Sequence, residues 1–300
     1  MKLYIKALRA PFLAGSVVPV IIGTTLAFSE NCFSFSLFLV AVIGVASLHL
    51  AANLLNDYYD ARGSDPLNLR LTPFSGGSRV IQNAELSPGV VLSMSILFFA
   101  IALATAAYMI FVGKPFAVII GLLGLFAGWA YSATPLQLMS KGWGEVLIFF
   151  AFGPLITFGV YYVMSGSLSL NAFTAGISQG FLISGVIWIN QFPDYEADKK
   201  AGKMNLVVRL GPGVSRYVYI TMILLSYAMV FFLVSVMDMS YLVMLIFISF
   251  PLAFKAMRIT FNEYLSFEGL IPAQALTIQI VIAQGLLLSL GLFLSRFINV

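Results

Sequence analysis

Residues 34–60 read SFSLFLVAVIGVASLHLAANLLNDYYD, an apolar run that passes directly into a polar, acidic segment. A helix needs about 20 mostly apolar residues to span a bilayer, and the run over 34–55 has that length. A transmembrane β-strand needs only about 10 residues and alternates apolar with polar side chains, which this run does not do. The stretch therefore predicts a membrane-spanning helix that brings carboxylates to one surface of the membrane.

The whole chain has the composition of a membrane protein. Of its 300 residues, 60% are hydrophobic and only 9% are charged, whereas soluble domains average about 25% charged residues. This excludes a soluble enzyme, a disordered chain and a nucleic-acid-binding protein as leading interpretations, despite the net charge of +4. We expect an all-α polytopic membrane protein that forms a single integral-membrane domain over residues 1–300. About nine transmembrane helices are predicted, at 11–28, 34–55, 89–112, 115–133, 144–164, 171–192, 216–236, 240–256 and 274–295.

The charged residues of the loops predict the orientation of these helices. If the N-terminus is cytoplasmic, 14 of the 16 basic residues lie on the cytoplasmic side and only Lys114 and Arg296 lie outside, which is a strong positive-inside bias. The C-terminus is then outside the cytoplasmic (inner) membrane. Ten of the 12 acidic residues, all except Glu30 and Asp238, fall on the same cytoplasmic side. Charge of both signs on one face indicates a polar site there.

The first acidic motif ends the second predicted helix. Asn53 and Asp57 are four residues apart, as are Asn56 and Asp60, so each pair lies on one part of a helix face. Carboxylates this close repel one another unless a cation lies between them. Oxygen ligands of this kind suit Mg²⁺.

The second acidic motif ends the sixth predicted helix. Asn190, Asp194 and Asp198 follow one another at intervals of four, which again forms one helical stripe. Pro193 is expected to bend or break the helix and so direct Asp194 into the mouth of a cavity. Lys203, with the neighbouring Lys199 and Lys200, adds positive charge beside the carboxylates.

The two motifs match each other and suggest an internal repeat. Each contains Asn-x3-Asp at the end of a span, and Asp57 and Asp194 are 137 residues apart. This spacing predicts two pseudo-repeated four-helix halves around a central cavity, with the ninth helix added. Facing each other, the two clusters would hold Mg²⁺ between them. The alternative is that both are merely solvated helix ends.

Both motifs resemble those of the UbiA superfamily of intramembrane prenyltransferases. The family's NDxxDxxxD motif is matched by Asn56, Asp57 and Asp60, and its DxxxD motif by Asp194 and Asp198. Asp65 comes one residue later than the family pattern predicts. The segments 72–82 and 198–211 resemble the loops of the branch that prenylates dihydroxynaphthoate in menaquinone synthesis.

The resemblance implies Mg²⁺-dependent transfer of a prenyl group from a prenyl diphosphate to an aromatic acceptor, through an allyl-cation-like intermediate. The implied partners are these two substrates and the lipid bilayer, with no nucleic acid. The metal-binding and catalytic residues would be Asp57, Asp60, Asp194 and Asp198. The substrate-binding residues would be Asn56 and Asn190 as oxygen ligands or donors, Arg79, Lys141 and Lys203 on the phosphates, and Tyr131 (or Tyr58) at the cation.

Other interpretations remain open at this point. An ion-coupled transporter also combines intramembrane carboxylates with internal repeats, although it would place them near the bilayer midplane. A UbiA-type enzyme acting on a different acceptor would carry the same motifs. His49, inside the second predicted helix, is expected to have a packing role rather than to act as a base.

Overall fold

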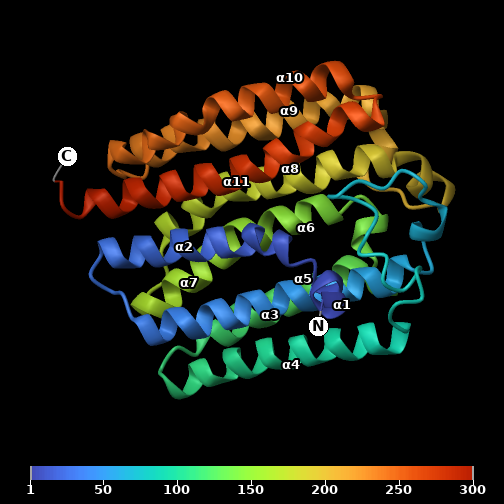
Figure 1. Cartoon of the computed structure of the whole chain (residues 1–300). Coiled ribbons are helices and arrows are strands. Elements are labelled where there is room, and N and C mark those ends of the chain that lie inside the picture. Colours follow the sequence, from blue (N-terminus) through green and yellow to red (C-terminus); the bar gives the residue numbers. More distant parts are fainter. Residues whose placement is uncertain (1, 299–300) are drawn as a thin grey trace.

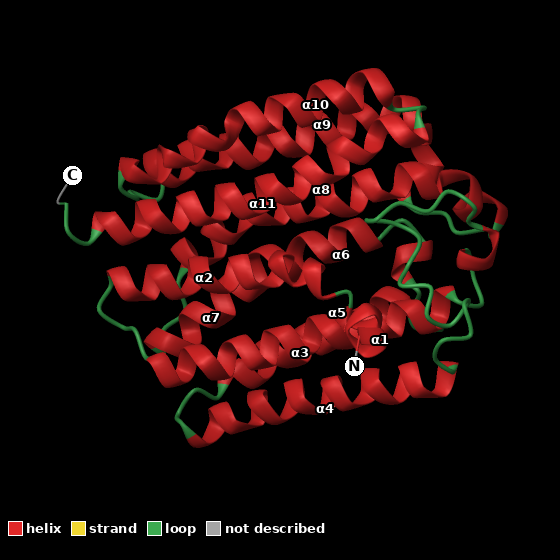
Figure 2. Cartoon of the chain, viewed as in Figure 1, coloured by secondary structure: helices red, strands yellow, loops and turns green. Residues whose placement is uncertain are grey.

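The structure, a computed structural model, describes residues 2–298 and is a bundle of long helices (Figures 1 and 2). Within that part of the chain every regular element is a helix, as the sequence predicts. Eight helical stretches are long and apolar enough to cross a membrane, and Phe116–Ser132 is a shorter apolar helix beside them. The elements are α1 (Lys2–Leu8), η1 (Ala10–Leu13), α2 (Ala14–Ser29), α3 (Phe35–Asp60), η2 (Asp65–Leu67), α4 (Pro88–Phe111), α5 (Phe116–Ser132), η3 (Leu138–Ser140), α6 (Gly144–Phe150), η4 (Ala151–Leu155), α7 (Ile156–Ser165), α8 (Leu170–Lys200), α9 (Leu206–Ser235), η5 (Tyr241–Ser249), α10 (Phe250–Glu263) and α11 (Phe267–Ser295).

Successive spans run in opposite directions, so alternate connections gather at opposite ends of the bundle (Figure 1). The connections α3–α4, α5–α6, α8–α9 and α10–α11 lie together at the right of the figure, and the C-terminus lies at the left. We call the right-hand end, where α3 and α8 finish, the motif end. Both acidic motifs are located there.

The helices α4, α8, α9 and α11 begin where the sequence provides a side-chain N-cap. The side chains of Ser87, Ser169, Asn205 and Ser266 accept hydrogen bonds from backbone N–H groups in the first turns of α4, α8, α9 and α11. Such caps satisfy donors that have no partner within the helix. The helix starts are therefore encoded locally.

Helix α8 is the axis of the bundle, whereas α4 lies at its edge. Of the apolar window of each helix, 78% is buried for α8 and 17% for α4. A Cβ on Gly153 of the π turn η4 would lie 2.5 Å from the Gly176 carbonyl oxygen of α8. Small residues allow such backbone-to-backbone packing in membrane bundles. The packing fixes α8, and with it the second motif, in the middle of the protein.

The outward surfaces are apolar. On α4, which lies at the edge of the bundle (Figure 2), Ile96, Leu97 and Phe111 are among the exposed large hydrophobic side chains. Exposed apolar bands of this size on long helices belong against lipid. The chain is a multi-pass membrane protein.

Several helix boundaries differ from those predicted: α10 ends at Glu263 rather than at 256, and α11 begins at Phe267 rather than at 274. Helix α8 continues past 192 to Lys200, and it does not break at Pro193. Proline is tolerated in membrane helices because neighbouring groups satisfy the freed backbone. The interruption instead lies in α9, which begins at Leu206 rather than 216 and leaves helical geometry at Gly211, before Pro212. The pseudo-repeat of two four-helix halves stays a prediction.

Candidate active site

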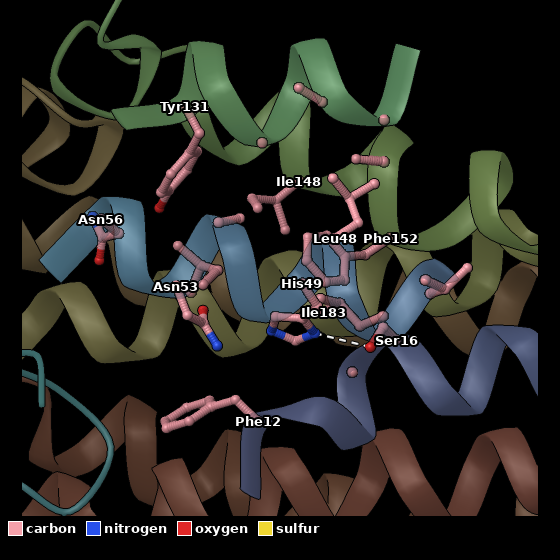
Figure 3. A pocket seen from close by; sticks show the side chains of 18 of the residues that line it. Phe12, Ser16, Leu48, His49, Asn53, Asn56, Tyr131, Ile148, Phe152 and Ile183 are labelled. Atoms are coloured by element: carbon pink, nitrogen blue, oxygen red, sulfur yellow. Dashed lines mark hydrogen bonds between the residues drawn. The ribbon is translucent and has the colours of Figure 1, made fainter. Parts of the chain in front are cut away.

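A cavity of about 320 Å³ runs from the motif end into the bundle (Figure 3). Its mouth is polar and its deeper walls are apolar, so its two parts suit different chemistry. The polar lining comprises Arg9, Ser16, His49, Asn53, Asn56, Asp60, Ser64, Asp65, Asn68, Ser75, Thr105, Tyr131, Asn190, Gln191, Asp194, Asp198 and Lys203. The apolar lining includes Phe12, Val40, Leu48, Met109, Ile120, Ile148, Phe152, Val163 and Ile183.

The first motif supplies carboxylates from the last turns of α3. The Asp57 carboxylate, only 3% exposed, accepts from the Ser78 backbone N–H at 3.3 Å and lies 3.7 Å from the Arg9 guanidinium. Asp57 borders the cavity without lining it. The Asp60 carboxylate does line it, and it accepts from Asn56 Nδ2 at 3.0 Å. Because these carboxylates have little contact with water, the neighbouring cations and hydrogen-bond donors stabilise their negative charge.

The loop after α3 folds back and adds Asp65 to this cluster. A Cβ at Gly77, whose φ is +72°, would lie 2.8 Å from Asp65 Oδ2 and 3.2 Å from Asp57 Oδ1. Gly77 thus permits a left-handed turn and leaves room for two converging carboxylates. Burial, followed by the charges of Asp60 and Asp57, raises the pKa of Asp65 to about 7. Asp65 comes one residue later than the family motif predicts, but its carboxylate lies close to that of Asp57.

The second motif faces the first across the cavity mouth. The Asp194 carboxylate accepts at 2.7 Å from Nδ2 of Asn68, which belongs to the loop after α3. The Asp198 carboxylate accepts at 2.7 Å from Nδ2 of Asn205, the N-cap of α9. The loop of the first motif therefore holds a carboxylate of the second.

Lys203 joins the two motifs directly. Its Nζ lies 3.2 Å from Asp60 Oδ2 and 3.7 Å from Asp198 Oδ1. Burial opposes the ammonium charge, but the carboxylates of Asp60 and Asp198 outweigh it and raise the pKa of Lys203 above its usual value. Asp60 and Asp198, one from each motif and 138 positions apart in the sequence, thus share one ammonium group.

The two matched asparagines present different groups. Asn56 donates its Nδ2 to Asp60, which leaves its Oδ1 available. Asn190 accepts at Oδ1 from Gln274 Nε2 at 3.0 Å, which leaves its N–H groups available. The first position therefore offers an oxygen and the second a donor.

The two tyrosines predicted to lie at the cation differ in position. Tyr131 lines the cavity, and its hydroxyl end points toward the face of α3 that carries Asn53 and Asn56 (Figure 3). Tyr58 does not line the cavity: its ring packs edge-on against Tyr59, with centroids 5.2 Å apart. Only Tyr131 is positioned beside the cavity.

Two predicted phosphate-binding residues lie outside the cavity walls. Arg79 donates its Nη1 to the backbone oxygen of Asp65 at 2.6 Å. Lys141 is exposed and donates its Nζ to the backbone oxygen of Pro135 at 2.9 Å. The structure does not bring Lys141 together with the carboxylates, and it uses Arg79 to hold the Asp65 loop.

Sequence reasoning missed several residues of the site. Arg9 precedes the first span with a left-handed backbone, φ 51°, and lines the cavity beside Asp57. Asn68 lies in a loop whose sequence shows no periodicity that would mark it. Arg9 carried a usable signal, since it is the basic residue nearest the start of the first span. Asn68 becomes recognisable only through its contact with Asp194.

Comparisons with known proteins agree on one fold and one family. The model of the UbiA prenyltransferase family matches residues 16–265. The 1,4-dihydroxy-2-naphthoate octaprenyltransferase of Bacillus subtilis is 25% identical over 290 residues, covering 96% of this chain and 91% of the relative. The enzyme of that name from Escherichia coli is 27% identical over 305 residues, covering 98% and 96%. A solved UbiA homolog from Archaeoglobus fulgidus bound to DMAPP and Mg²⁺ has the same fold, with a TM-score of 0.64, 21% identity, and coverage of 95% of this chain and 99% of that one.

Proposed function

The chain belongs to the UbiA prenyltransferase family, and from this premise we propose that it transfers a prenyl group from a prenyl diphosphate to a dihydroxynaphthoate-type aromatic ring. The enzyme class, prenyltransferase, follows from the family. The acceptor is proposed because the relatives named as 1,4-dihydroxy-2-naphthoate octaprenyltransferases cover nearly the whole chain. The observation that carries the proposal is the meeting of Asp60 and Asp198 at Lys203, above an apolar cavity.

The carboxylates at the mouth fit Mg²⁺ that is shared with a diphosphate. Among the described residues, no three carboxylate, histidine or cysteine side chains gather closely enough to enclose a metal by themselves. Mg²⁺ usually takes one or two carboxylates together with phosphate oxygens and water, so two opposed pairs suit it better than a closed cage would. The space kept open at Gly77 between two carboxylates supports the same reading. We propose that Asp57 and Asp60 on one side, and Asp194 and Asp198 on the other, hold the metal, with Asp65 beside them.

The bound metal would neutralise the charge that develops on the departing diphosphate. Lys203 contributes a positive charge beside Asp60, and Arg9 contributes one beside Asp57. Asn56 offers its oxygen toward the mouth and Asn190 its N–H groups. Asn190 is buried and the other three groups are half-buried, which strengthens their interaction with a diphosphate. Lys203 is therefore the principal phosphate-binding side chain of the proposal.

The reaction breaks one bond and forms another. The C1–O bond of the prenyl diphosphate breaks, and the electron pair leaves with the diphosphate. A carbon of the electron-rich ring gives an electron pair to C1, and the proton or carboxyl group on that carbon then departs, as H⁺ or CO₂. The apolar walls keep water from the allylic cation. The ring of Tyr131, at the cavity wall, is placed to stabilise the cation through its face.

The protein is proposed to lie in the cytoplasmic membrane as one domain, with the N-terminus and the site on the cytoplasmic side and the C-terminus outside. The positive-inside bias supports this orientation. Cys32, between α2 and α3, lies at the end opposite the motifs. An impermeant maleimide should label Cys32 in intact cells, whereas Leu69→Cys in a Cys32→Ser background should need permeabilised cells. The reverse pattern would mean that the orientation is inverted.

The activity is tested with purified protein, farnesyl or geranyl diphosphate, and a panel of aromatic acceptors, with and without Mg²⁺. The wild-type protein should form a prenylated ring only with Mg²⁺. The variants Asp57→Ala and Asp194→Ala should lose the activity while keeping a wild-type melting temperature in detergent. Prenyl transfer that persists in both variants would overturn the metal assignment.

A further inference from the structure

Below the carboxylates, the cavity contains a second polar feature that diphosphate chemistry does not use. Ser16 of α2 and His49 and Asn53 of α3 all line the cavity, flanked by the rings of Phe12 and Phe152 (Figure 3). The surrounding walls are apolar. A polar group in such a place needs a partner.

The contacts of Ser16 favour one tautomer of His49. Ser16 Oγ lies 3.1 Å from the Leu13 backbone oxygen and 2.9 Å from His49 Nδ1. A hydroxyl has one hydrogen, so both contacts are hydrogen bonds at once only if Ser16 donates to Leu13 and accepts from Nδ1–H. In this arrangement Nδ1 carries the proton of the neutral ring, and Nε2 is a free acceptor.

The ring of His49 is held in a fixed orientation. It meets the ring of Phe152 edge-on, with centroids 4.8 Å apart and an interplanar angle of 83°. The side chain is buried to 8% exposure. Figure 3 shows the nitrogen opposite Ser16 turned toward the Asn53 side of the cavity. Its acceptor lone pair is thus presented at a defined position.

Asn53 adds an unpaired donor nearby. Its Nδ2 is buried and has no hydrogen-bond partner among the described residues. A buried donor without a partner is unfavourable, because it has lost its hydrogen bonds to water. A prenyl chain cannot relieve this, because it has no polar atom beyond its diphosphate. An aromatic ring with two oxygen substituents can.

The position along α3 matches the reaction. His49, Asn53, Asn56 and Asp60 all face the cavity from this helix. At 1.5 Å per residue, Asn53 lies about 6 Å and His49 about 12 Å below Asp57 along the axis. This is the depth at which the carbon next to a diphosphate held by the mouth carboxylates would meet a second substrate.

We propose, on the basis of the function proposed above, that Ser16, His49 and Asn53 form the binding site for the hydroxyaromatic acceptor. A ring hydroxyl donates to His49 Nε2, and the Asn53 amide donates to another oxygen of the acceptor. The hydrogen bond to Nε2 draws the hydroxyl proton toward nitrogen and increases the electron density on the adjacent ring carbons. His49 then takes part in the site instead of serving only as a packing residue.

The test compares two ligands that differ by one hydroxyl group. Binding of 4-hydroxy-2-naphthoate and of 2-naphthoate to the purified full-length chain is measured by calorimetry in detergent. The wild-type protein should bind the hydroxylated ligand about tenfold more tightly, the effect of roughly one good hydrogen bond. His49→Phe should abolish that preference and leave the affinity for 2-naphthoate unchanged. His49→Gln, which keeps an acceptor, should retain part of the preference.

Two further serine variants separate the site from general effects on packing. Ser16→Ala should weaken the preference about threefold, because Nδ1 loses the partner that fixes the tautomer. Ser178→Ala is the matched control, since Ser178 is also a buried membrane serine that hydrogen-bonds to a backbone oxygen, Ser226 O, at 2.8 Å, but lies off the cavity. It should leave the preference unchanged.

The outcomes are decisive for the acceptor site. Equal loss of both ligands in the His49 variants, or no loss in either, would overturn the site, since only the hydroxyl-dependent part is assigned to Nε2. In turnover, His49→Gln should raise the KM for the aromatic acceptor and leave that for the prenyl diphosphate within about twofold. Failure of the wild-type protein to prenylate any acceptor would count against the proposed function, while the binding comparison would still judge the acceptor site.

Discussion

The two acidic motifs look alike in sequence but are held by different means. The first depends on a loop: Asp57 is bound by the Ser78 backbone N–H, and Gly77 leaves space for Asp65. The second is entirely helical and lies on the most buried helix, with its carboxylates bound by the amides of Asn68 and Asn205. Carboxylates with similar spacing in the sequence are therefore held in place by different contacts. The first motif, which depends on the backbone of the loop at Gly77 and Ser78, should be the more sensitive to changes in local backbone geometry.

Among the groups that support the carboxylates, the largest effect is expected at Lys203, where the two motifs meet. Lys203→Met should raise the KM for the prenyl diphosphate about 10- to 100-fold, because a buried charge-assisted contact is worth about 1.5–3 kcal/mol. Lys203→Arg should recover part of the loss, since it keeps the charge. Steady-state kinetics at saturating Mg²⁺ measure both. An unchanged KM in Lys203→Met would mean that the bridge between the motifs has no part in binding diphosphate.

A smaller effect is expected at Gly77, whose backbone geometry matters for the first motif but not for the second. Gly77→Ala places a Cβ against Asp65 and Asp57, so the Mg²⁺ concentration for half-maximal activity should rise about tenfold, through displaced carboxylates and roughly 1–2 kcal/mol of backbone strain. Gly202→Ala is the control, because Gly202 has φ +73° but a Cβ there would meet nothing within 4 Å. Equal shifts in the two variants would assign the effect to backbone strain alone.

The smallest effect is expected at the support of the second motif. Asn68→Ala removes one hydrogen bond to Asp194, of 2.7 Å, while α8 remains packed in the core. A net loss of about 1 kcal/mol corresponds to about a fivefold rise in the KM for the prenyl diphosphate. A loss as large as that of Lys203→Met would contradict the view that the packing of α8 supports the second motif more than its hydrogen bond from the loop does.

The sequence predicted the helices and the two motifs, because hydrophobic length and charge spacing are local properties. It also predicted that Lys203 would be part of the site, from its position just after Asp198. It could not predict that Arg79 and Lys141 would bind backbone carbonyls outside the cavity, since loop geometry determines where long basic side chains reach. Asn68 and the Ser16–His49 pair depend on contacts between segments far apart in the chain, which one sequence does not reveal.

The two motifs are proposed to form one site for a metal-bound diphosphate. A double-mutant cycle on Mg²⁺-dependent binding of geranyl diphosphate, with Asp60→Asn, Asp198→Asn and the double variant, measures whether they act together. If the carboxylates share one site, the two losses in binding free energy should be strongly non-additive, with the double variant little worse than either single variant. Additive losses would mean that the motifs act independently and would contradict the claim.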